Sequence, residues 1–392
     1  MYNFEDILYR NENGSKKWNI DYIDKRFPKH KSIYYPLFIA DMDYKLPEEI
    51  TSKFTEYIQT GDFGYFDVLE KFNNSISRWY KRVNNIHIDK KWIIPGIGTL
   101  ASMNIALKAT IKKNSNVLIF TPVYGPFKDI VINNKFNLTT QKLYKKKNRY
   151  YIDFDLLEKN IAKNEIKCIL MCNPHNPSGR VWSFEELNEL VKICKKYDVT
   201  LISDEVHSDL VLDKGKFTSM AQFFNTYKNI IISSSPNKTF NLAGISSSYI
   251  ITSDNSIYEN IESEFKKNKL GINRVGYEFS TICYNYGQDW VEELTLNIKS
   301  NIKLVKELLD LDGINVMEPE AGYLLWIKLD KVTNTLDFVE KLAQKTGVLV
   351  ESGTRFVDGE DGYIRLNVAT SKNILLKSMK ELVNFYRAFN EV

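Results

Sequence analysis

The sequence predicts an α/β protein with a mostly parallel sheet covered by helices on both faces, followed by a smaller α+β domain. Two observations carry this prediction. In the middle of the chain, short apolar runs alternate with amphipathic segments of helical spacing, which is typical of a parallel sheet with two buried faces. Over roughly the last hundred residues, this alternation gives way to a long helical pattern and isolated short strands, which indicates a separate unit.

Short apolar runs are the predicted strands of the sheet. Each is bounded by polar or turn-forming residues, such as the Thr-Pro that follows the first run and the Asn-Pro that follows the second. Runs of this length between helical segments are typical of strands buried on both faces. The predicted strands cover residues 116–120, 167–172, 199–203, 229–233 and 248–252.

Helical segments separate these strands. Residues 101–112 place Met103, Leu107 and Ile111 at helical spacing, as one buried helix face requires. Ser183 precedes Glu186 by three residues, a capping-box pattern that predicts the start of another helix. Strands and helices therefore alternate as they do in repeated βαβ units.

Three ranges are predicted for the domain organisation. Residues 1–50 form an N-terminal segment that packs with the small domain, 51–285 form the large ligand-binding domain, and 286–392 form the small α+β domain. The predicted elements of the small domain are a long helix at 290–309 and strands at 323–329 and 363–367.

The composition argues against a nucleic-acid partner. Hydrophobic residues are 43% and charged residues 26% of the 392 residues, and the formal net charge is +4, all ordinary for a globular protein. The lysine run 145–147 is predicted to be a solvated turn, and no aromatic or Gly-rich RNA motif accompanies it.

No membrane, targeting or metal-binding segment is expected. The chain has no run of 18 apolar residues, and residues 1–10 lack the apolar stretch of a signal peptide. The cysteines form no CxxC pair and the four histidines are scattered, so no metal site is predicted. A reducing cytoplasm is the expected compartment. The cysteines are Cys168, Cys172, Cys194 and Cys283.

Three polar segments follow predicted strands, at 173–179, 203–209 and 233–241. Each has an ordinary structural explanation, since the first is a turn sequence, Asp204 is placed like a helix cap, and Lys238 is placed like a solvated loop lysine. Their order is more informative, because Asp204 precedes Lys238 by 34 residues with one strand between them. Ligands bind at the carboxyl ends of strands in such sheets, so we expect a site there.

This set of segments resembles the class I/II aminotransferase superfamily, the fold-type I enzymes that use pyridoxal 5'-phosphate (PLP). Five further motifs extend over nearly the whole chain in the right order and are similar to the cystathionine β-lyase (C–S lyase) branch, often called MalY/PatB-type. The resemblance implies a seven-stranded sheet in the large domain, PLP as cofactor, and a homodimer. The motifs are Lys-Trp at 17–18, Ala-Asp-Met-Asp at 40–43, Phe-Gly-Tyr-Phe at 63–66, Thr-Pro-Val-Tyr-Gly-Pro at 121–126 and Tyr-Ile-Arg-Leu-Asn at 363–367.

The resemblance assigns four residues to the cofactor ring. Lys238 bonds PLP covalently, is released by the substrate amine, and then acts as the base that takes the α-proton. Asp204 keeps the pyridine nitrogen protonated, so that the ring withdraws electrons from the substrate α-carbon. Asn176 hydrogen-bonds the phenolic oxygen, and Tyr124 stacks on the ring, although a core tyrosine is the structural alternative. Tyr124 and Asn176 are also expected to border the substrate.

The phosphate requires N–H groups at a helix start and several hydroxyls. Gly98 and Thr99 precede the predicted helix at 101–112, although the Gly-Ile-Gly-Thr sequence is also a common turn. Ser235 lies three residues before Lys238 and is expected to add its hydroxyl. The resemblance further implies that Tyr65 reaches the phosphate from the partner subunit.

Two residues complete the expected site. Arg365 is expected to clamp the substrate carboxylate as a planar fork, although a surface strand arginine is the structural alternative. His207, taken to lie one helical turn beyond Asp204, is expected to brace that residue or the ring oxygen, or else merely to pack.

The implied function is β-elimination on L-cystathionine or a related cysteine thioether, which gives a thiol, pyruvate and ammonia. Many aminotransferases have a phosphate-binding arginine where this chain has Ser246, and the lyase branch commonly lacks that arginine, so the substitution favours a lyase. Two alternatives stay open: an aminotransferase that uses the same Lys238 and Asp204, and a lyase that also binds a regulatory protein.

Overall fold

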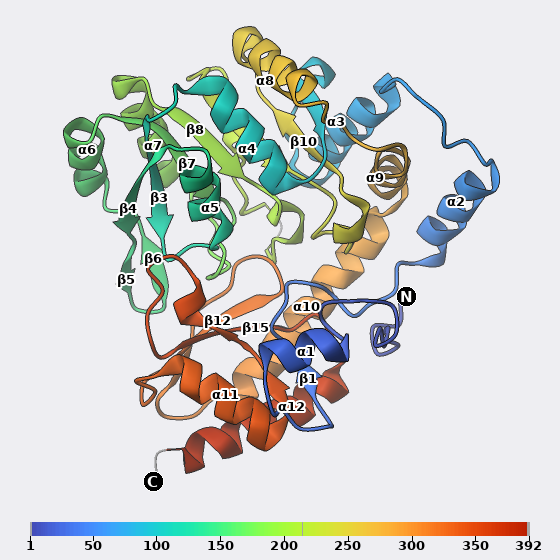
Figure 1. Cartoon of the computed structure of the whole chain (residues 1–392), viewed down its shortest axis with the longest axis vertical. Helices are drawn as coiled ribbons and strands as arrows, with labels where there is room; N and C mark the ends of the chain where they lie inside the picture. Colours follow the sequence, from blue (N-terminus) through green and yellow to red (C-terminus); the bar gives the residue numbers. More distant parts are fainter. Residues whose placement is uncertain (1, 214, 390–392) are drawn as a thin grey trace.

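The computed structural model describes residues 2–213 and 215–389. Its main sheet has seven strands in the order β2-β10-β9-β8-β7-β3-β4 (Figure 1). β10 runs antiparallel to both of its neighbours and the other pairs are parallel, so the predicted mostly parallel sheet is confirmed. The strands are Ile93–Gly96 (β2), Asn116–Thr121 (β3), Asn137–Lys142 (β4), Ile166–Cys172 (β7), Thr200–Asp204 (β8), Ile230–Ser234 (β9) and Ser248–Ile251 (β10).

Helices cover both faces of this sheet. Alternate residues of β3 enter different cores, with Val117 and Ile119 in one and Leu118 and Phe120 in the other, as the two-residue period of a strand requires. The first core is covered by α4 (Thr99–Thr110), α5 (Pro126–Asn133) and α8 (Asn255–Lys267). The second is covered by α3 (Glu70–Asn84), α6 (Phe154–Lys163), α7 (Phe184–Tyr197) and α9 (Arg274–Tyr286).

The capping box predicted at Ser183 is present at the start of α7. The Ser183 hydroxyl accepts a bond of 3.3 Å from the Glu186 N–H, and the Glu186 carboxylate accepts one of 2.9 Å from the Ser183 N–H. Two N–H groups that lack helical partners are thereby satisfied, which fixes where α7 begins.

A second, antiparallel sheet has the order β11-β12-β15-β14 and lies with α11 and α12 below the main sheet in Figure 1. Among the described residues, no helix has the length and apolar character needed to cross a membrane. The elements are α10 (Gln288–Leu308), β11 (Ile314–Val316), β12 (Leu324–Leu329), α11 (Thr335–Thr346), β14 (Glu351–Ser352), β15 (Tyr363–Asn367) and α12 (Lys372–Ala388).

The N-terminal segment contacts the C-terminal part of the chain. It contains α1 (Ile20–Arg26) and β1 (Tyr35–Pro36), and β1 pairs in parallel with β13 (Val348–Leu349). The division predicted at residue 50 falls inside α2 (Glu48–Gln59), while that at residue 286 falls at the last residue of α9, just before α10. The three domain ranges themselves stay a prediction.

The lysine run at 145–147 is not the simple turn that the sequence suggested. β5 (Tyr144–Lys146) and β6 (Arg149–Tyr151) form an antiparallel hairpin, with Lys147 at a φ of 53° between them. The rings of Tyr144 and Tyr151 stack at 5.5 Å on this hairpin. Cross-strand aromatic pairing stabilises the hairpin although its lysines are exposed.

Candidate active site

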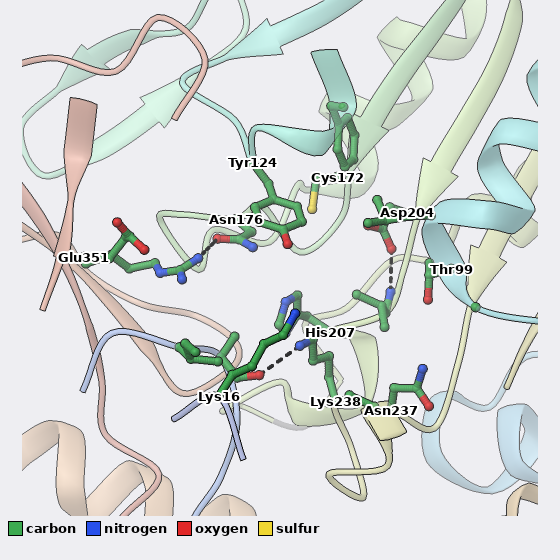
Figure 2. Close-up of a pocket in the computed structure, with 18 of the residues that line it drawn as sticks. Lys16, Thr99, Tyr124, Cys172, Asn176, Asp204, His207, Asn237, Lys238 and Glu351 are labelled. Carbon is green, nitrogen blue, oxygen red and sulfur yellow. Dashed lines mark hydrogen bonds between the residues drawn. The ribbon is translucent and has the colours of Figure 1, made fainter. Parts of the chain in front are cut away.

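A cavity of about 510 Å³ opens where β7, β8 and β9 end, between the main sheet and the second sheet (Figure 2). The strand ends place the three polar segments of the sequence side by side, as expected for the carboxyl edge of a parallel sheet. Eight of the ten predicted site residues line the cavity: Gly98, Thr99, Tyr124, Asn176, Asp204, His207, Lys238 and Arg365. Ser235 and Tyr65 do not line it.

Lys238 follows β9 and is half-buried in the cavity wall. Its Nζ donates a hydrogen bond of 2.8 Å to the Ala40 carbonyl oxygen. Burial lowers the pKa of the Lys238 amine, and the Arg365 charge lowers it further, while Asp41 and Asp204 oppose this effect. The amine is therefore easier to deprotonate than that of a solvated lysine, as a nucleophile or base requires.

Asp204 ends β8 with its carboxyl group buried. Burial raises its pKa to about 7, against the lowering effects of the Val206 N–H and the Lys238 charge. Among the described residues, one hydrogen bond to this carboxyl is present, 3.1 Å from the Val206 N–H. A cationic N–H placed in the cavity would therefore find an oriented carboxylate with acceptor capacity left.

The helical placement predicted for His207 is wrong. The chain turns after β8 and enters only a short 3₁₀ helix at Ser208–Leu210. Burial, followed by the charges of Lys238 and Arg365, lowers the pKa of His207 to about 3, so its imidazole is neutral. Its ring packs edge-on to Tyr323 at 6.4 Å, and within the described residues it makes no hydrogen bond to Asp204.

The N-terminus of α4 borders the cavity, and no described side chain caps it. Gly98, at a φ of 143°, is the N-cap residue, and its own N–H donates to the Ser248 hydroxyl at 2.8 Å. The next residues of α4 also line the cavity. Thr99 Oγ1 donates to Ser235 Oγ at 3.1 Å, so Ser235 stands behind Thr99. The uncapped N–H groups of this first turn suit an anion.

Arg365 comes from β15 of the second sheet, and Phe38 is its neighbour from the N-terminal segment. Its Nη1 donates to Asn176 Oδ1 at 3.1 Å, and its Nη2 donates to the Phe38 carbonyl oxygen at 3.2 Å. The guanidinium lies over the Phe356 ring at 5.1 Å. The arginine is buried, so the alternative of a surface strand arginine is wrong.

Tyr124 follows β3 and precedes α5, and its side chain borders the cavity. Burial raises the pKa of its hydroxyl, while the Arg365 charge lowers it. Tyr124 is therefore a neutral aromatic wall of the cavity rather than a core tyrosine.

Tyr65 lies outside this chain's own cavity, in a stretch without helix or strand. Its side chain is fully exposed. The neighbouring Phe66 is held against α9, with the Arg274 guanidinium 5.0 Å from its ring centroid. The segment is thus anchored at Phe66 while Tyr65 projects outward, and its contact with a partner's phosphate stays a prediction.

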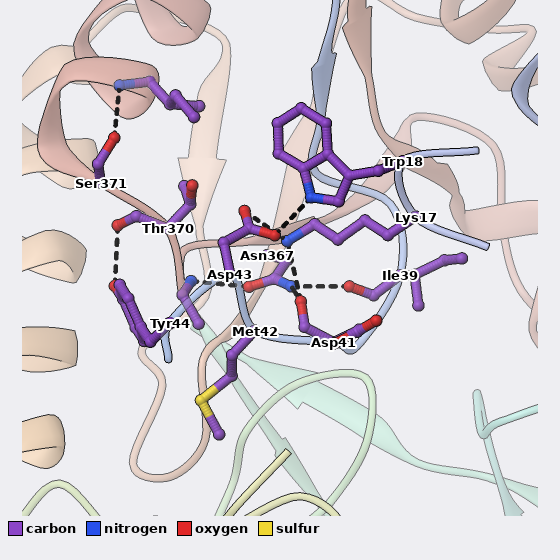
Figure 3. A network of polar contacts seen from close by, with 12 residues as sticks. Lys17, Trp18, Ile39, Asp41, Met42, Asp43, Tyr44, Asn367, Thr370 and Ser371 are labelled. Carbon is purple, nitrogen blue, oxygen red and sulfur yellow. Dashed lines mark hydrogen bonds and ion pairs between the residues drawn. The ribbon is translucent and has the colours of Figure 1, made fainter. Parts of the chain in front are cut away.

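The segment 40–43 is held by a network of buried polar contacts (Figure 3). Asp43 pairs with the Lys17 Nζ at 2.9 Å and accepts a bond of 2.8 Å from the Trp18 indole N–H. Asn367 Nδ2 donates to the carbonyl oxygens of Ile39 and Asp41 at 2.7 and 2.8 Å. These contacts bracket Ala40, whose carbonyl accepts the Lys238 hydrogen bond.

Four of the cavity residues that carry a charge or a hydroxyl were not anticipated from the sequence: Lys16, Tyr22, Arg26 and Glu351. They come from α1, from the turn before it and from β14. The only signal near them is the Lys-Trp motif at 17–18, which begins one residue after Lys16.

The donors and acceptors of the cavity fit PLP. Lys238 offers an amine of lowered pKa, Asp204 offers a buried carboxyl with spare acceptor capacity, and the uncapped start of α4 offers N–H groups for a phosphate. These three groups suit the aldehyde, the pyridine nitrogen and the phosphate of the cofactor, respectively.

Comparison with known proteins agrees with this geometry. Cystathionine beta-lyase PatB of Bacillus subtilis is 30% identical over 352 residues, which cover 88% of this chain and 91% of PatB. Protein MalY of Escherichia coli is 25% identical over 99% of this chain and 100% of its own. The crystal structure of cystalysin from Treponema denticola, which contains PLP, superposes with a TM-score of 0.93 at 29% identity and covers 100% of both chains. The model of the family "Aminotransferase class I and II" matches residues 39–379, so the chain belongs to that family.

Proposed function

We propose that this chain is a PLP-dependent C–S lyase that acts on L-cystathionine or a related cysteine thioether. The observation that carries the proposal is the convergence of Lys238, Asp204 and Arg365 on one cavity from two different sheets. A PLP enzyme that acts on α-amino acids needs three groups: a nucleophilic amine, a carboxylate that contacts the ring nitrogen, and a guanidinium that binds the substrate carboxylate.

Each residue has a distinct task. Bound PLP supplies an electron-withdrawing ring that stabilises negative charge at the substrate α-carbon. The Asp204 carboxylate holds a proton on the ring nitrogen, and the Lys238 Nζ takes the proton from the α-carbon. Arg365 orients the α-carboxylate so that the Cα–H bond faces Lys238. Tyr124 and Asn176 border the reacting groups, and Tyr124 excludes water from one face.

Elimination then breaks the Cβ–S bond, and the electron pair of that bond leaves on the sulfur as a thiolate. Water hydrolyses the remaining three-carbon fragment to pyruvate and ammonia. Ser246 supports elimination over transamination, because many aminotransferases have a phosphate-binding arginine at that position. In this chain Ser246 sits at a φ of 54° just after a 3₁₀ turn, Ala243–Ile245.

The protein is further proposed to be a homodimer in a reducing cytoplasm. The exposed Tyr65 beside the anchored Phe66 supports a partner that covers it. All four cysteines are free and buried, which agrees with a reducing compartment.

One comparison tests the reaction. The purified protein receives L-cystathionine without any keto acid, and in a separate assay an aromatic amino acid with 2-oxoglutarate. We expect rapid release of pyruvate in the first assay and slow amino-group exchange in the second. A faster second reaction per site would make the chain an aminotransferase with a lyase-like sequence.

A further inference from the structure

The cavity has two chemically different ends. Figure 2 shows Asp204 and Thr99 on one side and Glu351 on the opposite side, with Lys16 reaching in from the N-terminal segment. The side with Asp204, Lys238 and the start of α4 is accounted for by the cofactor. The lining also includes Lys16, Arg26 and Glu351, whose charges the proposed reaction does not use.

Glu351 lies directly beside the residue that holds the substrate. In the β14–β15 pair, Glu351 is the cross-strand partner of Arg365. Directly opposed residues in an antiparallel pair share a face, with Cβ atoms about 5 Å apart. Glu351 is therefore within reach of a substrate whose α-carboxylate is bound by Arg365.

Arg26 fixes the Glu351 carboxylate in position. The Arg26 Nη2 lies 2.6 Å from both Glu351 oxygens, and the Arg355 Nε lies 3.4 Å from one of them. A carboxylate has about four acceptor positions, so these contacts leave capacity for a further N–H donor. Glu351 is thus oriented and is able to bind an ammonium group.

Lys16 supplies a cation that no described residue pairs with. Among the described residues, it makes no hydrogen bond and no ion pair, although its side chain lines the cavity. Its neighbour Lys17 differs, since it is buried and paired with Asp43. Lys17 therefore stabilises the fold through its ion pair with Asp43, and the Lys16 ammonium is available to bind an anion.

We propose that Lys16 and Glu351 form a subsite for the far end of the substrate, an amino-acid group carried on the sulfur substituent. Lys16 binds the distal carboxylate, and Glu351, held by Arg26, binds the distal ammonium. This inference rests on the proposed lyase function and narrows its substrates to thioethers with a zwitterionic or acidic distal arm. Because cations outnumber carboxylates at this end, the distal carboxylate contributes more than the distal ammonium.

Four thioethers separate the charges of the distal arm: L-cystathionine, S-(2-carboxyethyl)-L-cysteine, S-(2-aminoethyl)-L-cysteine and S-propyl-L-cysteine. The readout is kcat/KM for pyruvate release from each. We expect the two substrates with a distal carboxylate to exceed the neutral one, and the substrate with only an ammonium to be the poorest. A hydrogen bond to a charged group at this site is expected to give a preference of about tenfold.

Three variants assign the preference to residues. Lys16→Met keeps the aliphatic stem, and we expect the cystathionine-to-propyl ratio of kcat/KM to fall about tenfold, with recovery in Lys16→Arg. Glu351→Gln should lower the ratio of cystathionine to the carboxyethyl substrate, because only the former has a distal ammonium. Lys25→Met, an exposed lysine of α1 outside the cavity lining, is the matched control and should leave every ratio unchanged.

The outcomes separate the two proposals. Pyruvate from all four substrates at similar kcat/KM would refute the subsite and leave the lyase function standing. A preference that survives Lys16→Met, or that Lys25→Met also removes, would refute the role of Lys16. The absence of pyruvate from every substrate would refute the lyase function itself.

Discussion

Arg365 Nη1 donates a hydrogen bond of 3.1 Å to Asn176 Oδ1, and this contact joins the second sheet to the loop that follows β7. The residue expected to hold the substrate carboxylate is therefore tied to the residue expected to contact the cofactor oxygen. A change in either side chain alters the position of both groups, because the guanidinium is buried and has few other partners.

Arg365→Lys tests whether the planar guanidinium binds the substrate carboxylate through two parallel hydrogen bonds. Lysine keeps the positive charge but cannot make two parallel hydrogen bonds, so we expect kcat/KM to fall about 100-fold, mainly through KM. Steady-state kinetics with L-cystathionine measure this change. Arg78→Lys, at an exposed arginine of α3 that bonds Asn285, is the control and should behave as wild type. An unchanged KM in Arg365→Lys would show that another group holds the carboxylate.

Asp204→Asn tests the buried carboxyl at the end of β8. The amide can still accept the Val206 N–H bond, but it does not hold a proton on the ring nitrogen. Loss of one such electrostatic group lowers kcat about 10²-fold or more. The absorption band of the bound cofactor should show that the variant still binds PLP. Asp198→Asn, at the exposed end of α7, changes a carboxylate just before the same strand and should have no effect. If Asp204→Asn turned over nearly as fast as the wild type, Asp204 would have no catalytic role and would only stabilise the turn after β8.

Mixed dimers test whether the site is shared. Tyr65→Ala and Lys238→Ala should each be inactive or weak, since one lacks the proposed phosphate contact and the other the nucleophile. A dimer with one chain of each kind regains one intact site, with Tyr65 from one chain and Lys238 from the other. Differently tagged chains, purified sequentially, measure this recovery. If verified mixed dimers had no activity, Tyr65 would not contribute to the active site of the partner subunit.

Glu205 predicts a pH dependence of stability. Burial raises its pKa to about 8, although the Ser219 hydroxyl, at 2.7 Å, and the Met220 N–H, at 2.8 Å, lower it. Between its ordinary pKa and about 8, the folded protein keeps a proton that the unfolded chain releases, so stability falls as pH rises. From pH 5 to pH 8, Glu205→Gln should gain on the order of 3 kcal/mol of unfolding free energy relative to wild type.

Urea unfolding at several pH values measures this difference. Glu189→Gln changes an exposed carboxylate of α7 that pairs with Lys192 and serves as the control. Parallel profiles for wild type and Glu205→Gln would contradict the buried, protonated state of Glu205.

Features with a local sequence signal were predicted well. The apolar runs located the strands to within a residue or two at each end, and the Ser183 capping box located the start of α7. Because parallel strands end at one edge, the order of Asp204 and Lys238 along the chain was enough to place them in one cavity.

Features set by tertiary structure were not predicted. Glu351 enters the cavity through the register of a two-residue strand against β15, and two residues carry no periodic pattern. Lys16 and Lys17 are adjacent in the sequence and cannot be told apart there. Only the folded structure shows that Lys17 is buried and paired with Asp43 while Lys16 lines the cavity. The error at His207 arose because the capping positions of a helix and the turn after a strand use the same polar residues.

Covalent labelling most directly tests the claim that Lys238 is the lysine that bonds PLP. Among the described residues, two lysines line the cavity, Lys238 and Lys16, and borohydride reduction fixes PLP to whichever lysine bonds it. The yellow purified protein, once reduced, is digested and its peptides are mapped by mass spectrometry. We predict that the label is confined to Lys238, lost in Lys238→Ala and retained in Lys16→Met. Label on Lys16, or a protein that takes up no PLP, would contradict the site described above.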